Sequence, residues 1–135
     1  MEVSEKIKSL IELTAELNKL DTIVYTLHSA LDCISNSIVL TDVFGDILWV
    51  NNAFLAVTGY SNSEVVGQNP RILKSGVHDA AFYKRLWDTI ISGDTWSGNV
   101  TNKYKDGSLH DEHMVITPVM KNGVIVNFVS VKQVF

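Results

Sequence analysis

The first thirty residues carry an apolar seam with a helical period. The seam advances by alternating steps of three and four residues, with polar residues between, through Leu10, Leu13, Leu17, Leu20, Val24, Leu27 and Leu31. Ile7, Ile11 and Ile23 widen this stripe. The pattern predicts a long amphipathic helix. Such a helix could pack on its own domain, but three heptads of strict spacing favour a parallel helix pair in a homodimer.

After this helix the apolar positions gather into short runs of the kind found in strands. SIVLTD and ILWV, separated by the turn VFGD, predict a hairpin over residues 37–50. The last forty residues predict three more strands, which turn at Asp106-Gly107 and at Asn122-Gly123. Both dipeptides are strong signals for a tight hairpin.

The middle of the chain predicts short helices. Asn51 or Asn52 is expected to cap a helix that ends at Gly59, and SNSEVVG predicts one further helical turn. DAAFYKRLWDTIISG begins at an Asp cap and ends at Gly93. Its apolar stripe is expected to hold Phe82, Leu86, Trp87, Ile90 and Ile91. The order of elements predicts an α+β domain, a five-stranded antiparallel sheet with the helices on one face.

Strand alternation assigns side chains to the two faces of this sheet. One face is expected to hold His110, Glu112, Met114 and Ile116 from the fourth strand and Val126, Phe128, Ser130 and Lys132 from the fifth. The other face of the fifth strand, with Ile125, Val129 and Val131, is also apolar. A sheet that is apolar on both faces needs two covers. The short helices supply one, and the N-terminal helix or a second subunit must supply the other.

Composition narrows the function classes. The chain has 135 residues, 46% of them hydrophobic and 19% charged, which is typical of one globular domain. A formal charge of −4 provides no basic surface for a nucleic acid or an anionic membrane. Cys33 is the single cysteine, so no intrachain disulfide can form, and no apolar run reaches the length of a bilayer. We therefore expect a cytoplasmic domain, which could be part of a larger protein.

The sequence contains no recognisable catalytic constellation. Gly67 and Gly76 bracket QNPRILKS, but no Gly-Lys-Ser/Thr run opens a helix there, as a phosphate-binding loop would require. His110 and His113 point to opposite faces of one strand, and the cysteine is distant, so a zinc site is not expected. The chain is therefore predicted not to be an enzyme.

Six motifs in order resemble those of PAS sensory domains. They are the strand ending in Thr-Asp, the Asn-Ala-Phe helix ending in Thr-Gly-Tyr, the GQNPRILKSG segment, the Leu-Trp helix, the Trp-Ser-Gly strand and the Lys-Asp-Gly turn. The likeness covers residues 31–132 and is closest to input modules of bacterial signalling proteins, such as sensor histidine kinases and diguanylate cyclases. It implies a helix over residues 1–30, a PAS sensor domain over 31–135 whose sheet cups a cavity, and an output domain after it.

The resemblance implies a sensor that detects a small ligand or a redox state in its cavity and relays it to the output domain. The alternative is a structural homodimerisation module with a filled core and no ligand. In the sensor, Ile72 and Leu73 are expected to turn toward the cavity. The residues expected to contact a cofactor are Asn69, Trp87, Trp96, Asn102, Glu112, Met114 and Phe128.

Three cofactors have precedents among domains that this chain resembles. Flavin photosensors place a reactive cysteine where Pro70 stands, and Asn and Gln where Glu112 and Lys132 stand, so a cysteinyl–flavin adduct is excluded. Haem sensors use an axial histidine on the long helix or its approach. His78 is the only candidate nearby, but its neighbours suit a helix cap, so haem is not expected.

Flavin redox sensors of nitrogen-fixation and methane-oxidation regulators, which bind FAD, share motifs that match Trp87, Trp96 and Asn102. Against this, Val39 and Pro70 stand where that subfamily can carry polar contacts. The cofactor therefore stays open between FAD, another small ligand and an empty cavity.

Glu112 is the most informative polar residue of the cavity face. Among Met114 and Ile116 a buried carboxylate needs a partner, which Lys132, Arg71 or Lys74 could supply. The alternative is that Glu112 lies near the end of its strand and is solvated.

Overall fold

The computed structural model describes residues 2–134, and the chain divides into two compact units at Cys33. The first unit is helix α1, Glu2–Asp32, which confirms the predicted long helix. Taken by itself, α1 buries none of its residues, and its seam from Leu10 to Leu27 is more than half exposed. No helix within residues 2–134 is both long and apolar enough to span a bilayer.

The second unit is built on a five-stranded antiparallel sheet, as predicted. Its strands are β1 (Ser37–Thr41), β2 (Ile47–Val50), β3 (Trp96–Lys103), β4 (Leu109–Lys121) and β5 (Val124–Val134). The order across the sheet is β2-β1-β5-β4-β3, so the last strand lies in the middle, paired with β1 and β4. In the β4–β5 turn Asn122 and Gly123 have φ angles of 52° and 77°, the tight geometry that Asn-Gly predicts.

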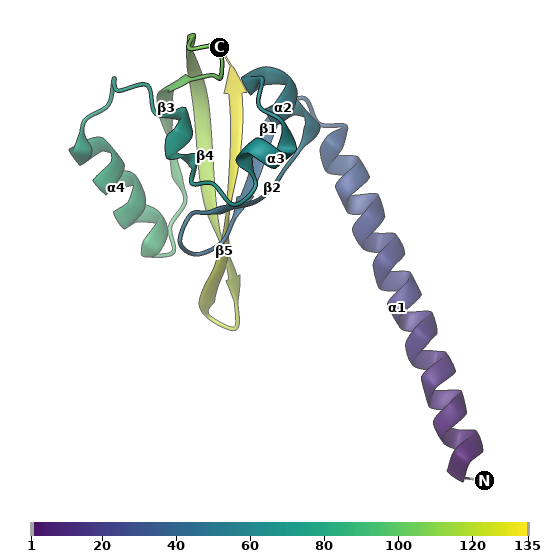
Figure 1. Cartoon of the computed structure of the whole chain (residues 1–135). Helices are drawn as coiled ribbons and strands as arrows, with labels where there is room; N and C mark the ends of the chain where they lie inside the picture. The colour runs from purple at the N-terminus through teal and green to yellow at the C-terminus, as the bar shows by residue number, and fades with distance from the viewer. Residues whose placement is uncertain (1, 135) are drawn as a thin grey trace. The chain divides into compact units, whose positions relative to one another are not determined.

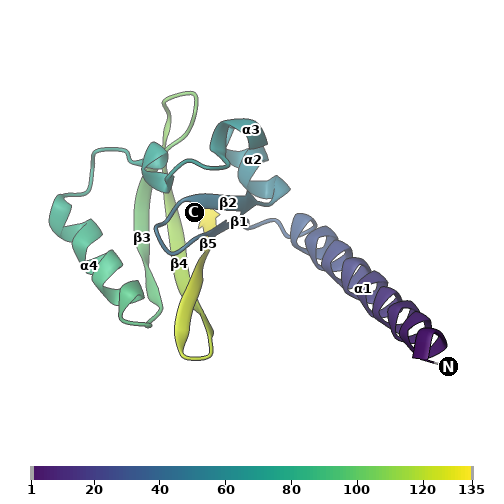
Figure 2. The same cartoon turned by 60° about the horizontal axis from the view of Figure 1, so that its bottom comes forward.

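Short helices cover one face of this sheet (Figures 1 and 2). They are α2 (Asn52–Thr58), α3 (Asn62–Val65), the 3-10 helix η1 (Pro70–Leu73) and α4 (Ala80–Ile91). In both views α4 runs beside β3, while α2 lies at the β1 end of the sheet. The predicted caps are confirmed, since the side chains of Asn51 and Asp79 accept hydrogen bonds from backbone N–H groups in the first turns of α2 and α4. Nothing in the periodicity indicated η1, because four residues are too few to show an apolar repeat.

Asn51 ties the start of α2 to the first strand. Its side chain is fully buried, and its Oδ1 accepts hydrogen bonds from the backbone N–H groups of Phe54 at 3.1 Å and Ile38 at 2.9 Å. Its Nδ2 donates to the carbonyl oxygen of Asn36 at 2.9 Å. One amide therefore satisfies three backbone groups that come from two different elements.

The core consists of two clusters of buried side chains. One holds Val39, Ile47, Val50, Phe54, Val65 and Leu73, and the other holds Leu86, Ile90, Ile116 and Phe128. Ile91 was expected on the buried stripe of α4, but it is 61% exposed, so that assignment was wrong. Leu86 and Ile90 lie one turn apart and fill the stripe, whereas Ile91 is rotated about 100° further around the helix.

Candidate functional site

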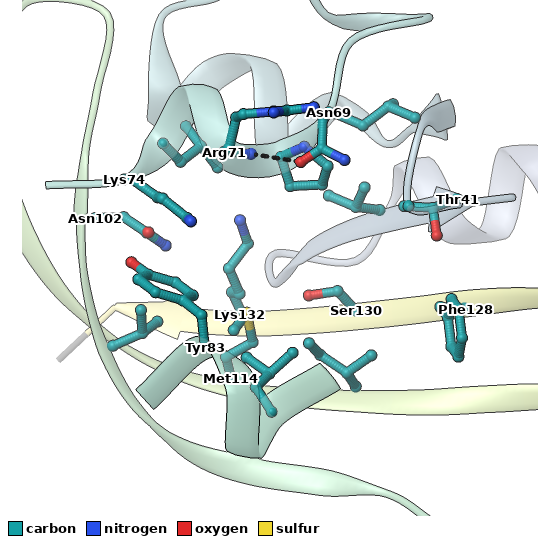
Figure 3. Close-up of a pocket in the computed structure, with 18 of the residues that line it drawn as sticks. Thr41, Asn69, Arg71, Lys74, Tyr83, Asn102, Met114, Phe128, Ser130 and Lys132 are labelled. Atoms are coloured by element: carbon teal, nitrogen blue, oxygen red, sulfur yellow. Dashed lines mark hydrogen bonds between the residues drawn. The ribbon is translucent and has the colours of Figure 1, made fainter. Parts of the chain in front are cut away.

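A cavity of about 350 Å³ lies between the sheet and the short helices (Figure 3). This volume falls within the usual range of small-molecule sites. The sheet contributes Val39, Val100, Asn102, Met114, Ile116, Phe128, Ser130 and Lys132, and the helices with their approaches contribute Asn69 to Arg71, Leu73, Lys74, Tyr83, Leu86, Trp87 and Ile90. Alternate residues of β5 thus face the cavity, as strand alternation predicts.

The predicted contact residues divide into two groups. Five of the seven line the cavity, namely Asn69, Trp87, Asn102, Met114 and Phe128. Trp96 and Glu112 are not among the lining residues. The Trp96 ring instead packs edge to face on Phe82, with centroids 5.6 Å apart, and holds α4 on β3. Leu73 is buried in the wall, as expected, whereas Ile72 packs against the core and is not among the residues that line the cavity.

Glu112 is buried and does not reach solvent. It is 1% exposed, and its carboxylate accepts a hydrogen bond of 3.0 Å from the side-chain amide of Asn102. Of the two alternatives for Glu112, the structure has the buried one, but the partner is an amide and none of the three candidate cations. Asn102 pairs across the ladder with His110, which places it diagonally opposite Glu112 on the same face. The Tyr104 hydroxyl is buried nearby, and burial together with the negative charge of Glu112 raises the pKa of this phenol.

Lys132 is a candidate ligand contact that the sequence pattern did not predict. The pattern indicated it only as a possible partner of Glu112. Lys132 is 5% exposed and lines the cavity, with Nζ 5.1 Å from the centroid of the Phe54 ring. Within residues 2–134 its ammonium forms no ion pair and no hydrogen bond. Burial lowers the pKa of Lys132, and the charge of Glu112 offsets this only in part. Figure 3 shows its side chain rising from β5 into the cavity, with Ser130 and Tyr83 on either side.

Two hydroxyl groups of the wall are also buried without partners. These are Ser130 Oγ and Tyr83 Oη, and no described residue accepts from or donates to either of them. Burial raises the pKa of Tyr83. An unpaired buried hydroxyl costs free energy, so two of them beside an unpaired ammonium indicate a place where a ligand or water belongs.

The segment from η1 to α4 closes the cavity and is held on β3. Ser75 Oγ donates to the carbonyl of Thr101 at 2.6 Å, and His78 Nε2 accepts from the Thr101 N–H at 2.9 Å. The His78 ring also stacks on Phe82, with centroids 4.0 Å apart. His78 is therefore engaged in holding this wall. Lys74 is exposed at the rim, where its Nζ lies 3.9 Å above the Tyr83 ring.

Gly45, in the β1–β2 loop, meets the Trp87 ring at the cavity wall. Its φ angle is 89°, and a Cβ atom there would lie 2.7 Å from Cη2 of Trp87. Gly45→Ala is therefore expected to destabilise the domain by about 1–2 kcal/mol through backbone strain alone, and to displace Trp87 as well. Urea unfolding and tryptophan fluorescence measure the two effects.

Gly76→Ala is the matched control for this change. Gly76 has a φ angle of 86°, but nothing lies within 4 Å of a Cβ placed there. Gly76→Ala should lose stability through backbone strain, but the tryptophan fluorescence of the folded protein should stay unchanged. Equal losses of unfolding free energy and identical fluorescence spectra for the two variants would show that Trp87 does not pack on Gly45.

Among the residues that the structure describes, no three His, Cys, Asp or Glu side chains gather in a way that could hold a metal ion. Cys33 is exposed and belongs to the α1 unit, and the cavity wall contains Pro70 and no cysteine.

Comparison with known proteins identifies the family. The family model described as "PAS domain" matches residues 35–132. The nitrogen fixation regulatory protein of Klebsiella oxytoca is 37% identical over 86 residues, covering 64% of this chain and 17% of that protein. The aerotaxis receptor of Escherichia coli K12 is 28% identical over 92 residues, covering 68% and 18%. The chain thus spans less than a fifth of the length of these relatives.

A solved structure, described under "Flavin Analogue Sheds Light on Light-Oxygen-Voltage Domain Mechanism", has a TM-score of 0.72 and 28% identity, covering 82% of this chain and 85% of that one. The fold, the cavity and the family match agree with one another. The chain belongs to the PAS domain family and is a sensory, signal-transducing domain.

Proposed function

We propose that this PAS domain is a non-catalytic sensor that holds a small ligand in the cavity under its short helices and relays its state to an output domain. The observation that carries this proposal is the lone buried ammonium of Lys132 beside the unpartnered hydroxyls of Ser130 and Tyr83. A domain that served only as a structural dimerisation module would gain stability by filling this space with apolar side chains. Two unpartnered hydroxyls and an ammonium without a contacting anion, all in the wall of one cavity, therefore favour the sensor.

The ligand we propose is a flavin, in the form of FAD. An isoalloxazine ring is apolar on its faces and carries carbonyl oxygens and ring nitrogens along one edge. Apolar and aromatic side chains, Trp87 and Phe128 among them, would contact the faces, and Lys132 and Ser130 would donate to the edge. A bound flavin would supply reversible electron transfer. Pro70 in the wall offers no thiol, so the sensing would depend on redox state and not on a cysteinyl adduct.

The absorbance spectrum of the purified protein tests this proposal. Flavin-type bands that stay with the protein through gel filtration, and release of FAD on denaturation as identified by mass spectrometry, are the expected result. A colourless protein that also fails to take up added FAD would contradict the flavin assignment. Release of a different small molecule would keep the sensor and replace its ligand.

We further propose that α1 pairs with the same helix of a second copy and that the outer sheet face takes part in the homodimer. In β5, Ser130 and Lys132 line the cavity, whereas Val129 and Val131 lie on the opposite face of the same strand. A ligand that shifts β5 therefore changes both faces of the sheet. Such a shift would alter how the two copies pack and so reach an output domain. We place the domain in the cytoplasm.

A further inference from the structure

The charges of the cavity wall are all of one sign. Arg71, Lys74 and Lys132 line the cavity, and no Asp or Glu is among the residues of the wall. Arg71 and Lys74 are exposed at the rim, where water can solvate them. Lys132 is the exception, because its charge lies inside.

The nearest acid does not neutralise Lys132. Glu112 lies on the same face of the sheet as Lys132, but its carboxylate accepts a hydrogen bond from the Asn102 amide, and no salt bridge joins it to Lys132. The attraction between them only partly offsets the burial of Lys132. The other groups that face the same space, Tyr83 and Ser130, bring hydroxyls and no charge. A buried cation without a contacting anion is expensive for the fold, which suggests that its partner comes from outside the chain.

The remainder of the wall is mostly apolar. Val39, Ile47, Leu86 and Ile90 face the same space as Lys132. A ligand that fits both features has an apolar body and one negatively charged group at its buried end. Free inorganic anions would satisfy Lys132 but leave the apolar wall without a contact.

We propose that Lys132 forms an anion site at the inner end of the cavity, where it binds a negatively charged group carried on an apolar ring, with the hydroxyls of Ser130 and Tyr83 as further donors. The inference rests on the proposed ligand-binding function and specifies its chemistry. Two sources supply such a group: a carboxylate on an aromatic body, which is always charged, or a flavin ring, which takes up two electrons and one proton on reduction and is left with one negative charge.

Two matched probe pairs separate these sources. The first pair is a naphthalene carboxylate and the corresponding neutral carboxamide. The second pair is oxidised FAD and FAD reduced anaerobically with dithionite. For each source that the cavity uses, the member with the additional negative charge, the carboxylate or the reduced flavin ring, is expected to bind the wild-type protein about tenfold or more tightly than its counterpart, as measured by calorimetry. In Lys132→Met this preference should disappear.

The variant is expected to fold. Removal of a lone buried charge leaves the ligand-free domain as stable as the wild type or more stable, and Lys121→Met, on an exposed position of β4, controls for the loss of a lysine. Urea unfolding without ligand checks this, and a large loss of stability in Lys132→Met would contradict the lone-cation assignment.

The outcomes are distinct. Preference for the charged carboxylate without FAD binding would keep the anion site and reject the flavin. FAD that binds equally in both redox states, with no preference in the carboxylate pair, would keep the flavin and overturn the anion site. Failure of both charged probes to bind, or a preference that persists in Lys132→Met, would also overturn it and leave water as the partner of Lys132.

Discussion

Asn51→Ala is expected to destabilise the PAS unit by about 3 kcal/mol or more. The side chain caps α2 through the Phe54 N–H and also satisfies the Ile38 N–H and the Asn36 carbonyl. Alanine removes the cap and leaves the groups at the start of β1 without their partner. Because Asn51 is fully buried, water cannot readily replace the amide.

Urea unfolding followed by circular dichroism measures this loss. Asn62→Ala is the matched control, since Asn62 is an exposed residue at the start of α3, and its replacement should change the free energy of unfolding by less than about 0.5 kcal/mol. A loss of only about 1 kcal/mol for Asn51→Ala would mean that the link to β1 contributes little and that Asn51 is an ordinary helix cap.

Leu17→Glu is expected to convert the proposed homodimer to a monomer. Leu17 lies in the middle of the α1 seam and is 52% exposed in the single chain. In a parallel helix pair, the two copies of this residue would meet, so the substitution would bring two carboxylates together in an apolar interface. Light scattering at several protein concentrations measures the change in mass.

Thr22→Glu is the control for this substitution, because it adds the same charge on the side of the helix away from the seam. It should leave the dimer intact. A wild-type protein that is monomeric at high concentration would reject the helix pair. A dimer that survives Leu17→Glu would shift the interface to another surface, such as the outer face of the sheet.

The sequence pattern predicted features that depend on neighbours along the chain. The caps at Asn51 and Asp79, the Asn122-Gly123 turn and the inward direction of Phe128, Ser130 and Lys132 follow from local rules, and the structure has all of them. The expected faces of Val126 and Ile125 were wrong, because a β-bulge in the β4–β5 pairing leaves Val126 exposed and turns Ile125 toward the core. Ile91 shows the limit of such rules, since an apolar residue at the edge of a stripe can face water at little cost.

Features that depend on register across the sheet were harder to predict. Alternation placed Glu112 on the correct face, but only the β3–β4 register brings Asn102 into reach as its partner. Trp87 and Gly45 are distant in sequence, and their contact exists only because α4 folds over the β1–β2 loop. Whether Lys132 has an ionic partner depends on every element that packs around its side chain. No local sequence pattern can therefore indicate that it has none.

The central claim is that FAD binds in the cavity beside Ser130, and an FAD titration of wild-type protein and Ser130→Leu tests it most directly. Leucine adds apolar volume inside the cavity and removes an unpartnered hydroxyl, so the domain should stay folded. Ser97→Leu, on an exposed position of β3, is the control. We predict saturable binding to the wild type and the control, and a loss of affinity of about tenfold or more in Ser130→Leu. Equal affinity in all three proteins, or no binding to the wild type, would contradict the account.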